Sequence, residues 1–128
     1  MDKPAHPATP VSVDPLRISR SIDDAYHNQR IASVNDHEIR MSVMTSAFPW
    51  HRHPDSDETF FCVDGELVIE LDNSEVTLRP GEFLTVPKGV RHRTRPGGSR
   101  SVNLTFEKLD SDTLFDCADL DVLLHPRR

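Results

Sequence analysis

The stretch WHRHPDSDE, residues 50–58, carries the most informative pattern in this chain of 128 residues. Its histidines His51 and His53 are two positions apart, and residues i and i+2 of an extended strand project to the same face. Residues 54–56 then favour a turn, so that Glu58 returns on the adjacent strand toward the same point. Two imidazoles and a carboxylate that converge in this way have the geometry of a metal chelate.

A further histidine, His92, supplies a fourth candidate ligand behind Gly81, Pro87 and Gly89. Imidazoles with one carboxylate suit Zn, Fe, Mn or Ni, and four ligands leave one or two positions of a five- or six-coordinate ion open to water or substrate. We therefore expect one divalent transition metal per chain.

The sequence around these residues alternates between apolar and polar positions with a period of two, which is typical of strands. Turn residues such as Asp64-Gly65 and Pro80-Gly81 separate the segments. Short strands at regular spacing predict an all-β sandwich or barrel. The predicted strands are 31–35, 39–45, 58–63, 66–71, 75–78, 83–86, 90–95 and 101–106.

Over residues 31–106 the chain resembles the cupin superfamily, and within it the small single-domain cupins that are similar to mannose-6-phosphate isomerase sequences. The motif G-x5-H-x-H-x3-4-E-x6-G is matched at His51, His53, Glu58 and Gly65. The motif G-x5-P-x-G-x2-H-x3-N is matched at Gly81, Pro87, Gly89 and His92. Thr45 replaces the leading glycine of the first motif and Pro96 the closing asparagine of the second.

This resemblance implies a conical β-barrel of the jelly-roll type, also called a double-stranded β-helix. It also implies a divalent metal near the wider mouth of the barrel, held by His51, His53, Glu58 and His92. Asp57 competes with Glu58 for the inward position, because neighbouring strand residues face opposite ways, and the family pattern favours Glu58.

Three other residues are candidates for the pocket lining. Phe60 and Cys62 share the predicted face of Glu58, although both are equally suited to the hydrophobic core. Trp50 lies at the approach to the pocket, where it would serve as packing, as a dimer contact or as a substrate platform.

The chain divides into three predicted parts. Ser21 and Asp24 form a capping pair that predicts one helical turn through about Asn28. Partial helical spacing of apolar residues between Leu109 and Leu124 predicts a short C-terminal helix packed outside the barrel. The parts are a proline-rich flexible arm at 1–15, the barrel at 16–106 and a helical extension at 107–128.

Composition excludes several classes of protein. With 15 Lys and Arg against 21 Asp and Glu, the net charge of −6 disfavours phosphate-driven binding of nucleic acid. The longest apolar runs are far shorter than the roughly 20 residues of a membrane span. The polar beginning does not resemble a signal peptide, so we expect a cytoplasmic protein. Exposed sheet edges and the N-terminal arm predict a homodimer.

The sequence therefore predicts a small-molecule metalloenzyme in which substrate oxygens coordinate the metal. An isomerase or epimerase, a lyase, a cyclase and a dioxygenase all fit this prediction. The alternative is a non-catalytic sensor or storage module that binds a metal or a sugar. Arg91, Arg93 and Arg95 flank His92 and are expected on the opposite strand face, toward solvent or an adjoining sheet. A sugar-phosphate substrate would require a basic clamp, and the sequence assigns no inward-facing Lys or Arg.

Overall fold

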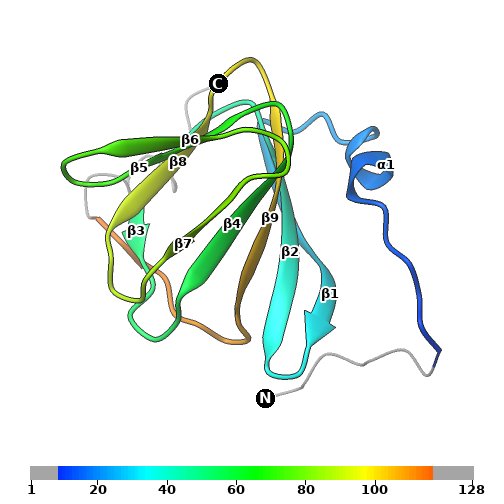
Figure 1. Cartoon of the computed structure of the whole chain (residues 1–128), viewed down its shortest axis with the longest axis horizontal. Coiled ribbons are helices and arrows are strands. Elements are labelled where there is room, and N and C mark those ends of the chain that lie inside the picture. Colours follow the sequence, from blue (N-terminus) through cyan, green and yellow to red (C-terminus); the bar gives the residue numbers. More distant parts are fainter. Residues whose placement is uncertain (1–8, 117–128) are drawn as a thin grey trace.

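The computed structural model describes residues 9–116. Two antiparallel sheets of five strands each face one another and enclose the core (Figure 1). The strand order is β1-β2-β9-β4-β7 in the first sheet and β10-β3-β8-β5-β6 in the second. The prediction of an all-β barrel is therefore confirmed.

The elements are α1 (Pro15–Ser19), β1 (Tyr26–Val34), β2 (His37–Met44), β3 (Phe48–Arg52), β4 (Glu58–Asp64), β5 (Leu67–Glu70), β6 (Glu75–Leu78), β7 (Phe83–Val86), β8 (His92–Pro96), β9 (Ser101–Lys108) and β10 (Leu114–Phe115). Within the described range no helix has the length and apolar character that a membrane crossing needs.

The main hydrophobic core lies between the two sheets. Alternate residues of β4 point inward, which buries Glu58, Phe60 and Cys62 and leaves the residues between them half-buried. The cluster of buried apolar residues consists of Met44, Phe60, Cys62, Leu67, Ile69, Leu78 and Val86.

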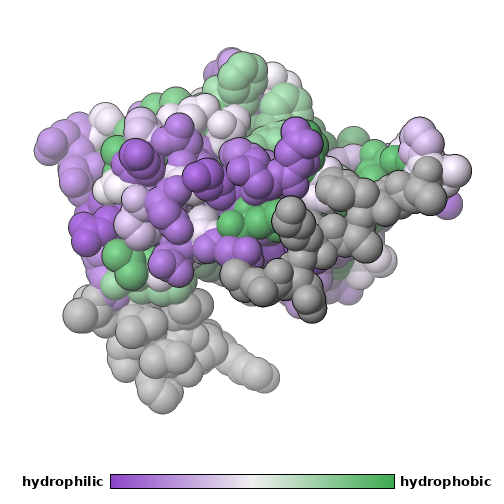
Figure 2. All heavy atoms as spheres, turned by 90° about the horizontal axis from the view of Figure 1, so that it is seen from below, coloured by the Kyte–Doolittle hydropathy of each residue, from purple (hydrophilic) through white to green (hydrophobic). Residues whose placement is uncertain are grey.

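A second core covers the outer face of the first sheet. Met41 and Val43 of β2 are fully buried there, and Ile18 and Ile22 pack against them. The segment that carries these isoleucines lies outside the sheet (Figure 1). It is held by Arg100, whose guanidinium donates to the carbonyl of Ser19 at 2.6 Å and to that of Ile22 at 3.3 Å. Both faces of β2 are consequently buried. Seen from below, after a quarter turn from the view of Figure 1, the surface is largely hydrophilic, with separate small hydrophobic patches (Figure 2).

The helical turn that we predicted from Ser21 to Asn28 is wrong. The helix lies earlier, at Pro15–Ser19, where the carboxylate of Asp14 accepts a hydrogen bond from the amide of Arg17 at 3.2 Å. An aspartate cap followed by proline is a favourable helix start. Asn28 instead lies in β1, which pairs with β2.

The helix predicted from residue 107 onward is also wrong within the described range. β9 continues to Lys108, and a turn through Asp110, at φ 64°, leads to β10. β10 pairs with β3, so that this segment adds a strand to the second sheet. Residues 117–128, which complete the predicted helical extension, lie outside the described residues.

Candidate metal centre

Four buried side chains converge between the sheets. His51 lies on β3, His53 just beyond its end, and Glu58 and His92 are the first residues of β4 and β8. His51 and His92 are direct neighbours in the pairing of β3 with β8. One donor atom from each of the four lies within 4.8 Å of the others. The structure thus brings together all four residues that the sequence singled out as ligands.

The three imidazole rings are fixed by backbone carbonyls. Nδ1 of His51 donates to the carbonyl of Pro49 at 2.7 Å, and Nδ1 of His53 to that of Asp112 at 3.0 Å. Nδ1 of His92 donates to the carbonyl of Val90 at 2.9 Å. A carbonyl only accepts, so each Nδ1 carries a hydrogen. In the neutral ring Nε2 then keeps its lone pair, which is the usual arrangement of metal-binding histidines.

The donor set fits a metal ion. The Nε2 atom of His53 is buried without a well-directed hydrogen bond, although it lies 3.1 Å from Oε1 of Glu58. An unpaired buried polar atom costs about 1–3 kcal/mol, and a bond to a metal would remove that cost. Donors bound at about 2.0–2.2 Å lie within roughly 4.4 Å of one another, so only a small contraction of the group is needed. The group can therefore hold a metal ion.

The aspartate next to Glu58 faces elsewhere. Asp57 is exposed, and its carboxylate accepts a hydrogen bond from the backbone amide of Lys88 at 2.8 Å. Oε1 of Glu58 lies 3.1 Å from Nε2 of His92. The alternation of β4 thus turns Glu58, and not Asp57, toward the histidines.

Burial and neighbouring charges shift the pKa values of His51, His53 and Glu58. Burial and the neighbouring His92 lower the pKa of His51 to about 4. Burial alone would lower the pKa of His53, but the Glu58 carboxylate, 3.1 Å from its Nε2, outweighs burial and raises that pKa to about 9. Burial would likewise raise the pKa of Glu58, yet the nearby rings of His53 and His92 hold it below its usual range. Without a metal, an imidazolium at His53 therefore pairs with the Glu58 carboxylate.

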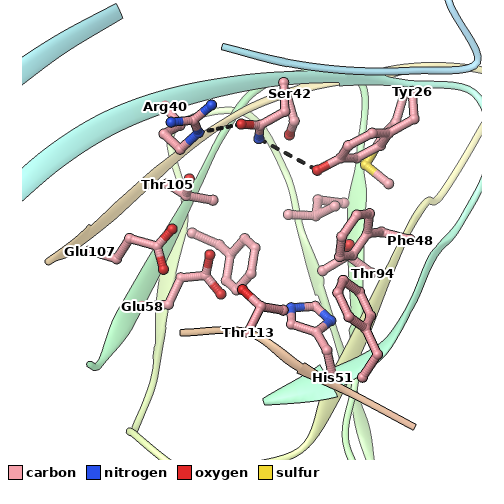
Figure 3. A pocket seen from close by; sticks show the side chains of 15 residues that line it. Tyr26, Arg40, Ser42, Phe48, His51, Glu58, Thr94, Thr105, Glu107 and Thr113 are labelled. Carbon is pink, nitrogen blue, oxygen red and sulfur yellow. Dashed lines mark hydrogen bonds between the residues drawn. The ribbon is translucent and has the colours of Figure 1, made fainter. Parts of the chain in front are cut away.

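A cavity of about 300 Å³ opens onto His51 and Glu58. Figure 3 shows Glu58, Thr113 and His51 at one end of this cavity and Arg40, Ser42 and Tyr26 at the other. The cavity also has apolar lining residues, which are Met44, Phe48, Phe60, Leu67 and Phe115, and two threonines, Thr94 and Thr105.

Of the three residues predicted to line the pocket, only one does so. Phe60 lines the cavity. Trp50 does not, since it precedes the inward-facing His51 and takes the other face of β3, where the guanidinium of Arg91 lies 4.0 Å from the centre of its ring. Cys62 faces inward but is fully buried in the hydrophobic cluster and does not line the cavity.

Sequence reasoning missed the polar residues of the cavity, among them Arg40 and Glu107. Both line it, from β2 and β9. The sequence had allowed no inward-facing Lys or Arg to be assigned, and the structure places Arg40 at the cavity. The available signal was the alternation of β2, but both faces of that strand are buried, so the pattern did not show which face lies inside.

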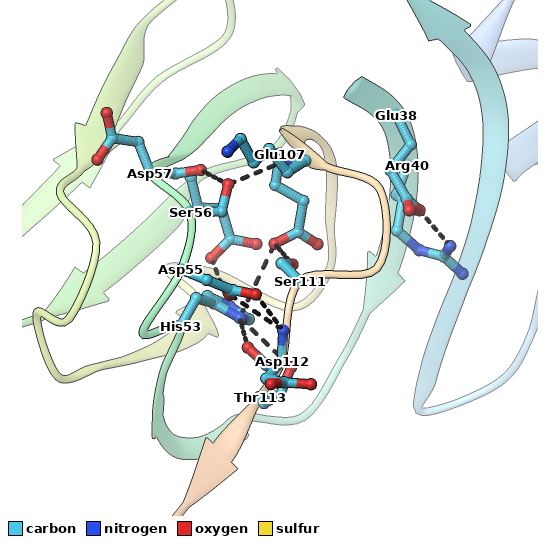
Figure 4. Close-up of polar contacts among 12 residues, drawn as sticks. Glu38, Arg40, His53, Asp55, Ser56, Asp57, Glu107, Ser111, Asp112 and Thr113 are labelled. Atoms are coloured by element: carbon cyan, nitrogen blue, oxygen red, sulfur yellow. Dashed lines mark hydrogen bonds and ion pairs between the residues drawn. The ribbon is translucent and has the colours of Figure 1, made fainter. Parts of the chain in front are cut away.

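The segment that follows β9 closes one side of the metal centre (Figure 4). Besides the Asp112 carbonyl, the hydroxyl of Thr113 lies 3.3 Å from Nδ1 of His53. Ser111 donates to the carboxylate of Glu107 at 3.1 Å. Phe115 packs beside His51, with ring centres 5.9 Å apart. This segment therefore belongs to the site. Our prediction that the chain packs outside the barrel here is wrong for the described residues.

Comparison with known proteins identifies the family of this chain. The family model described as the cupin domain matches residues 37–106. This chain belongs to the cupin family. It is 40% identical over 100 residues to the uncharacterized protein YdbB of Bacillus subtilis (strain 168), a match that covers 77% of this chain and 88% of YdbB.

Solved structures of other cupins have the same fold. A cupin-2 domain containing protein of Shewanella frigidimarina is 26% identical, with a TM-score of 0.70, over 76% of this chain and 94% of its own. A Ralstonia eutropha protein, provisionally described as a mannose-6-phosphate isomerase, is 28% identical with a TM-score of 0.57, over 69% of this chain and 87% of its own. The predicted resemblance to small cupins of this kind is confirmed.

Other curated relatives match a shorter stretch. The chain spans 41% of the protein SchB of Streptomyces halstedii, at 39% identity, and 13% of the quercetin 2,3-dioxygenase of Bacillus subtilis (strain 168), at 40% identity.

Proposed function

We propose that this cupin is a metal-dependent enzyme whose small-molecule substrate binds the metal through its own oxygen atoms. The observation that carries the proposal is the convergence of four buried donors at one end of a cavity that also carries apolar side chains. At about 300 Å³ the cavity holds a volume of roughly ten water molecules, which suits a small metabolite rather than a polymer.

His51, His53, Glu58 and His92 would hold the ion. When bound, a divalent ion with three neutral imidazoles and one carboxylate retains about one net positive charge, with which it can polarise a carbonyl or stabilise an enolate. Among these four, His51 and Glu58 face the cavity directly, so a substrate approaches the site from their side.

Glu107 is placed to exchange a proton with the substrate. Its carboxylate lines the cavity, and Oε2 lies 3.8 Å from Nδ1 of His53, on the side away from the Nε2 donor. A carboxylate beside the metal-binding group supports reactions that move a proton, as an isomerase, an epimerase, a lyase or a cyclase does.

The names of two curated relatives also bear on the class of reaction. The quercetin 2,3-dioxygenase named above matches 35% of this chain, and the tetracenomycin polyketide synthase protein TcmJ of Streptomyces glaucescens matches 44% at 35% identity. One is named for a dioxygenase reaction and the other for polyketide synthesis. The proposal therefore includes a dioxygenase as well as an isomerase, an epimerase, a lyase and a cyclase.

Elemental analysis followed by turnover assays tests the proposal. The purified protein is expected to contain close to one equivalent of Zn, Fe, Mn or Ni. Oxygen consumption by the Fe(II)-loaded protein, measured with diols and diketones, separates a dioxygenase from the other classes. Tight binding of such compounds without turnover of any of them would contradict an enzyme and favour the sensor or storage module.

We also infer a cytoplasmic homodimer. The reason is the exposed apolar residues near the N-terminal end of the described range, Val11, Val13 and Leu16, whose burial against a second chain would be favourable. Light scattering at micromolar concentration is expected to give twice the mass of 14.5 kDa of one chain. A single species of 14.5 kDa would contradict the dimer.

A further inference from the structure

Three polar side chains form a row at the end of the cavity that lies away from the metal centre. Arg40 lies on β2, and Asn28 and Tyr26 lie on the neighbouring β1. Nε of Arg40 donates to Oδ1 of Asn28, and Nδ2 of Asn28 donates to the hydroxyl oxygen of Tyr26 at 3.4 Å. The dashed lines in Figure 3 mark these two hydrogen bonds.

The direction of this row follows from the chemistry of its first member. A guanidinium has donors and no acceptor, so the atom of Asn28 that faces it must be the carbonyl oxygen. The amide nitrogen of Asn28 then faces Tyr26, whose oxygen accepts. The phenolic hydrogen of Tyr26 is consequently left to bond with a third group. Within the described part of the chain the Tyr26 hydroxyl has no second hydrogen-bond partner.

We propose that the Tyr26 hydroxyl donates this hydrogen bond to an acceptor oxygen of the substrate, at the end opposite the oxygens that bind the metal. The inference rests on the proposed function for the metal-bound end of the substrate. The recognition of the far end depends only on the row of Arg40, Asn28 and Tyr26.

Aromatic rings that line the cavity indicate the chemical character of the middle part of the ligand. The ring of Tyr26 packs on Phe48, with centres 4.8 Å apart, and Phe48 packs on Phe115, with centres 5.8 Å apart. Aromatic rings stack favourably on flat apolar groups at such distances. The structure therefore favours a planar, apolar middle over a flexible polyol.

Charge selects a neutral acceptor over a carboxylate. Nη1 of Arg40 lies 2.6 Å from Oε1 of Glu38, so the positive charge at this end is already paired. Glu107 faces the same cavity with a further carboxyl group. Burial also raises the pKa of Tyr26 to about 12, which keeps its hydroxyl protonated at neutral pH. A ketone or ester carbonyl fits this end, because the charge of Arg40 is already paired and an anion would face the carboxyl group of Glu107.

Hydroxamates that differ at one substituent test the inference. Benzohydroxamates bind a metal through the hydroxamate group and carry an acetyl, isopropyl or carboxyl substituent at position 3 or 4. The acetyl and isopropyl compounds have similar shape, but only the former offers a carbonyl. For at least one position, the metal-loaded protein is expected to bind the acetyl compound about 5-fold more tightly than the isopropyl compound, and more tightly than the carboxyl compound.

Two variants separate hydrogen bonding from shape. Tyr26→Phe keeps the ring and removes the hydroxyl, so the preference for acetyl over isopropyl should vanish. Asn28→Asp keeps the size but replaces the amide donor by a carboxylate, which then accepts the hydrogen of Tyr26 and should also abolish the preference. Equal binding of both compounds by the unaltered protein at both positions, or a preference that persists in both variants, would overturn the proposal.

A spectroscopic measurement keeps the two proposals apart. Tyr26 is the only tyrosine of the chain, so labelling with tyrosine carrying ¹³C at Cζ gives one signal that needs no assignment. Acetophenone, which has no metal-binding group, should shift this signal in the metal-free protein, whereas isopropylbenzene should not. Absence of hydroxamate binding would contradict the metal site alone, and identical responses to acetophenone and isopropylbenzene would contradict the role of Tyr26.

Discussion

His53 and Asp112 are joined by a hydrogen bond across 59 residues of sequence: Nδ1 of the histidine donates to the carbonyl of the aspartate at 3.0 Å. The backbone amide of Asp112 in turn donates to the carboxylate of Asp55, at 3.1 Å from Oδ1. The orientation of one candidate ligand therefore depends on how the segment after β9 is held against the loop after β3.

Loss of the Asp55 carboxylate should weaken metal binding without removing a ligand. Partners that orient a ligand typically contribute 10–100-fold to metal affinity, and Asp55 acts one bond further away, so we expect Asp55→Ala to lower the affinity about 3–10-fold. Competition with a chromophoric chelator measures this change. Asp55→Asn, which keeps an acceptor oxygen, is the matched control and should stay near the affinity of the unaltered protein. Equal affinity of all three proteins would contradict the role of the segment.

Metal binding should release about one proton at neutral pH. The pKa of His53 in the metal-free protein is raised to about 9, so this ring must lose a proton before Nε2 can bind a metal. The affinity should thus rise about tenfold per pH unit between pH 7 and 9 and level off above pH 9. Calorimetric titrations in two buffers of different ionisation enthalpy count the protons released. An affinity that does not change between pH 7 and 9 would show that His53 is neutral before binding.

The carboxylates of Glu58 and Glu107 should differ in their effect on metal content. Glu58 belongs to the group of converging donors, whereas Glu107 does not. Glu58→Gln should lower metal affinity at least about tenfold, while Glu107→Gln should retain close to one equivalent. Elemental analysis after dialysis compares the two variants. Similar losses from both would mean that Glu107 is also a ligand.

Gly65 should tolerate a side chain worse than Gly98. The φ of Gly65 is +73°, and a Cβ there would lie 2.2 Å from the carbonyl oxygen of Arg100, whereas a Cβ on Gly98 meets nothing within 4 Å. Left-handed backbone strain and this overlap together should lower the free energy of unfolding by about 3 kcal/mol in Gly65→Ala. Gly98→Ala should stay within about 0.5 kcal/mol of the unaltered protein. Urea denaturation measures both, and equal stabilities would contradict the close approach.

The centre of the site was predictable because it lies in short-range patterns. His51, His53 and Glu58 span one strand end, one turn and the start of the next strand. Residues that are close in the sequence are therefore also close in space here. Positive φ at Gly65, Gly81 and Gly89 explains why glycine occupies those motif positions.

The far end of the cavity was not predictable in the same way. Arg40 and Tyr26 come from strands whose inner face depends on what covers the outer face. Ile18 of α1 and Ile22, which follows that helix, cover the outer face. Two other differences from the prediction also depend on long-range contacts. Arg100 holds the end of α1 through the carbonyl of Ser19, and β10, in the segment after β9, pairs with β3.

Metal content of single-histidine variants tests the central claim most directly. The purified protein should hold close to one equivalent of a divalent transition metal, and His51→Ala and His92→Ala should each lose most of it. His37→Ala, at an exposed histidine outside the site, should retain it and serves as the control. Full metal content in both His51→Ala and His92→Ala would contradict the site.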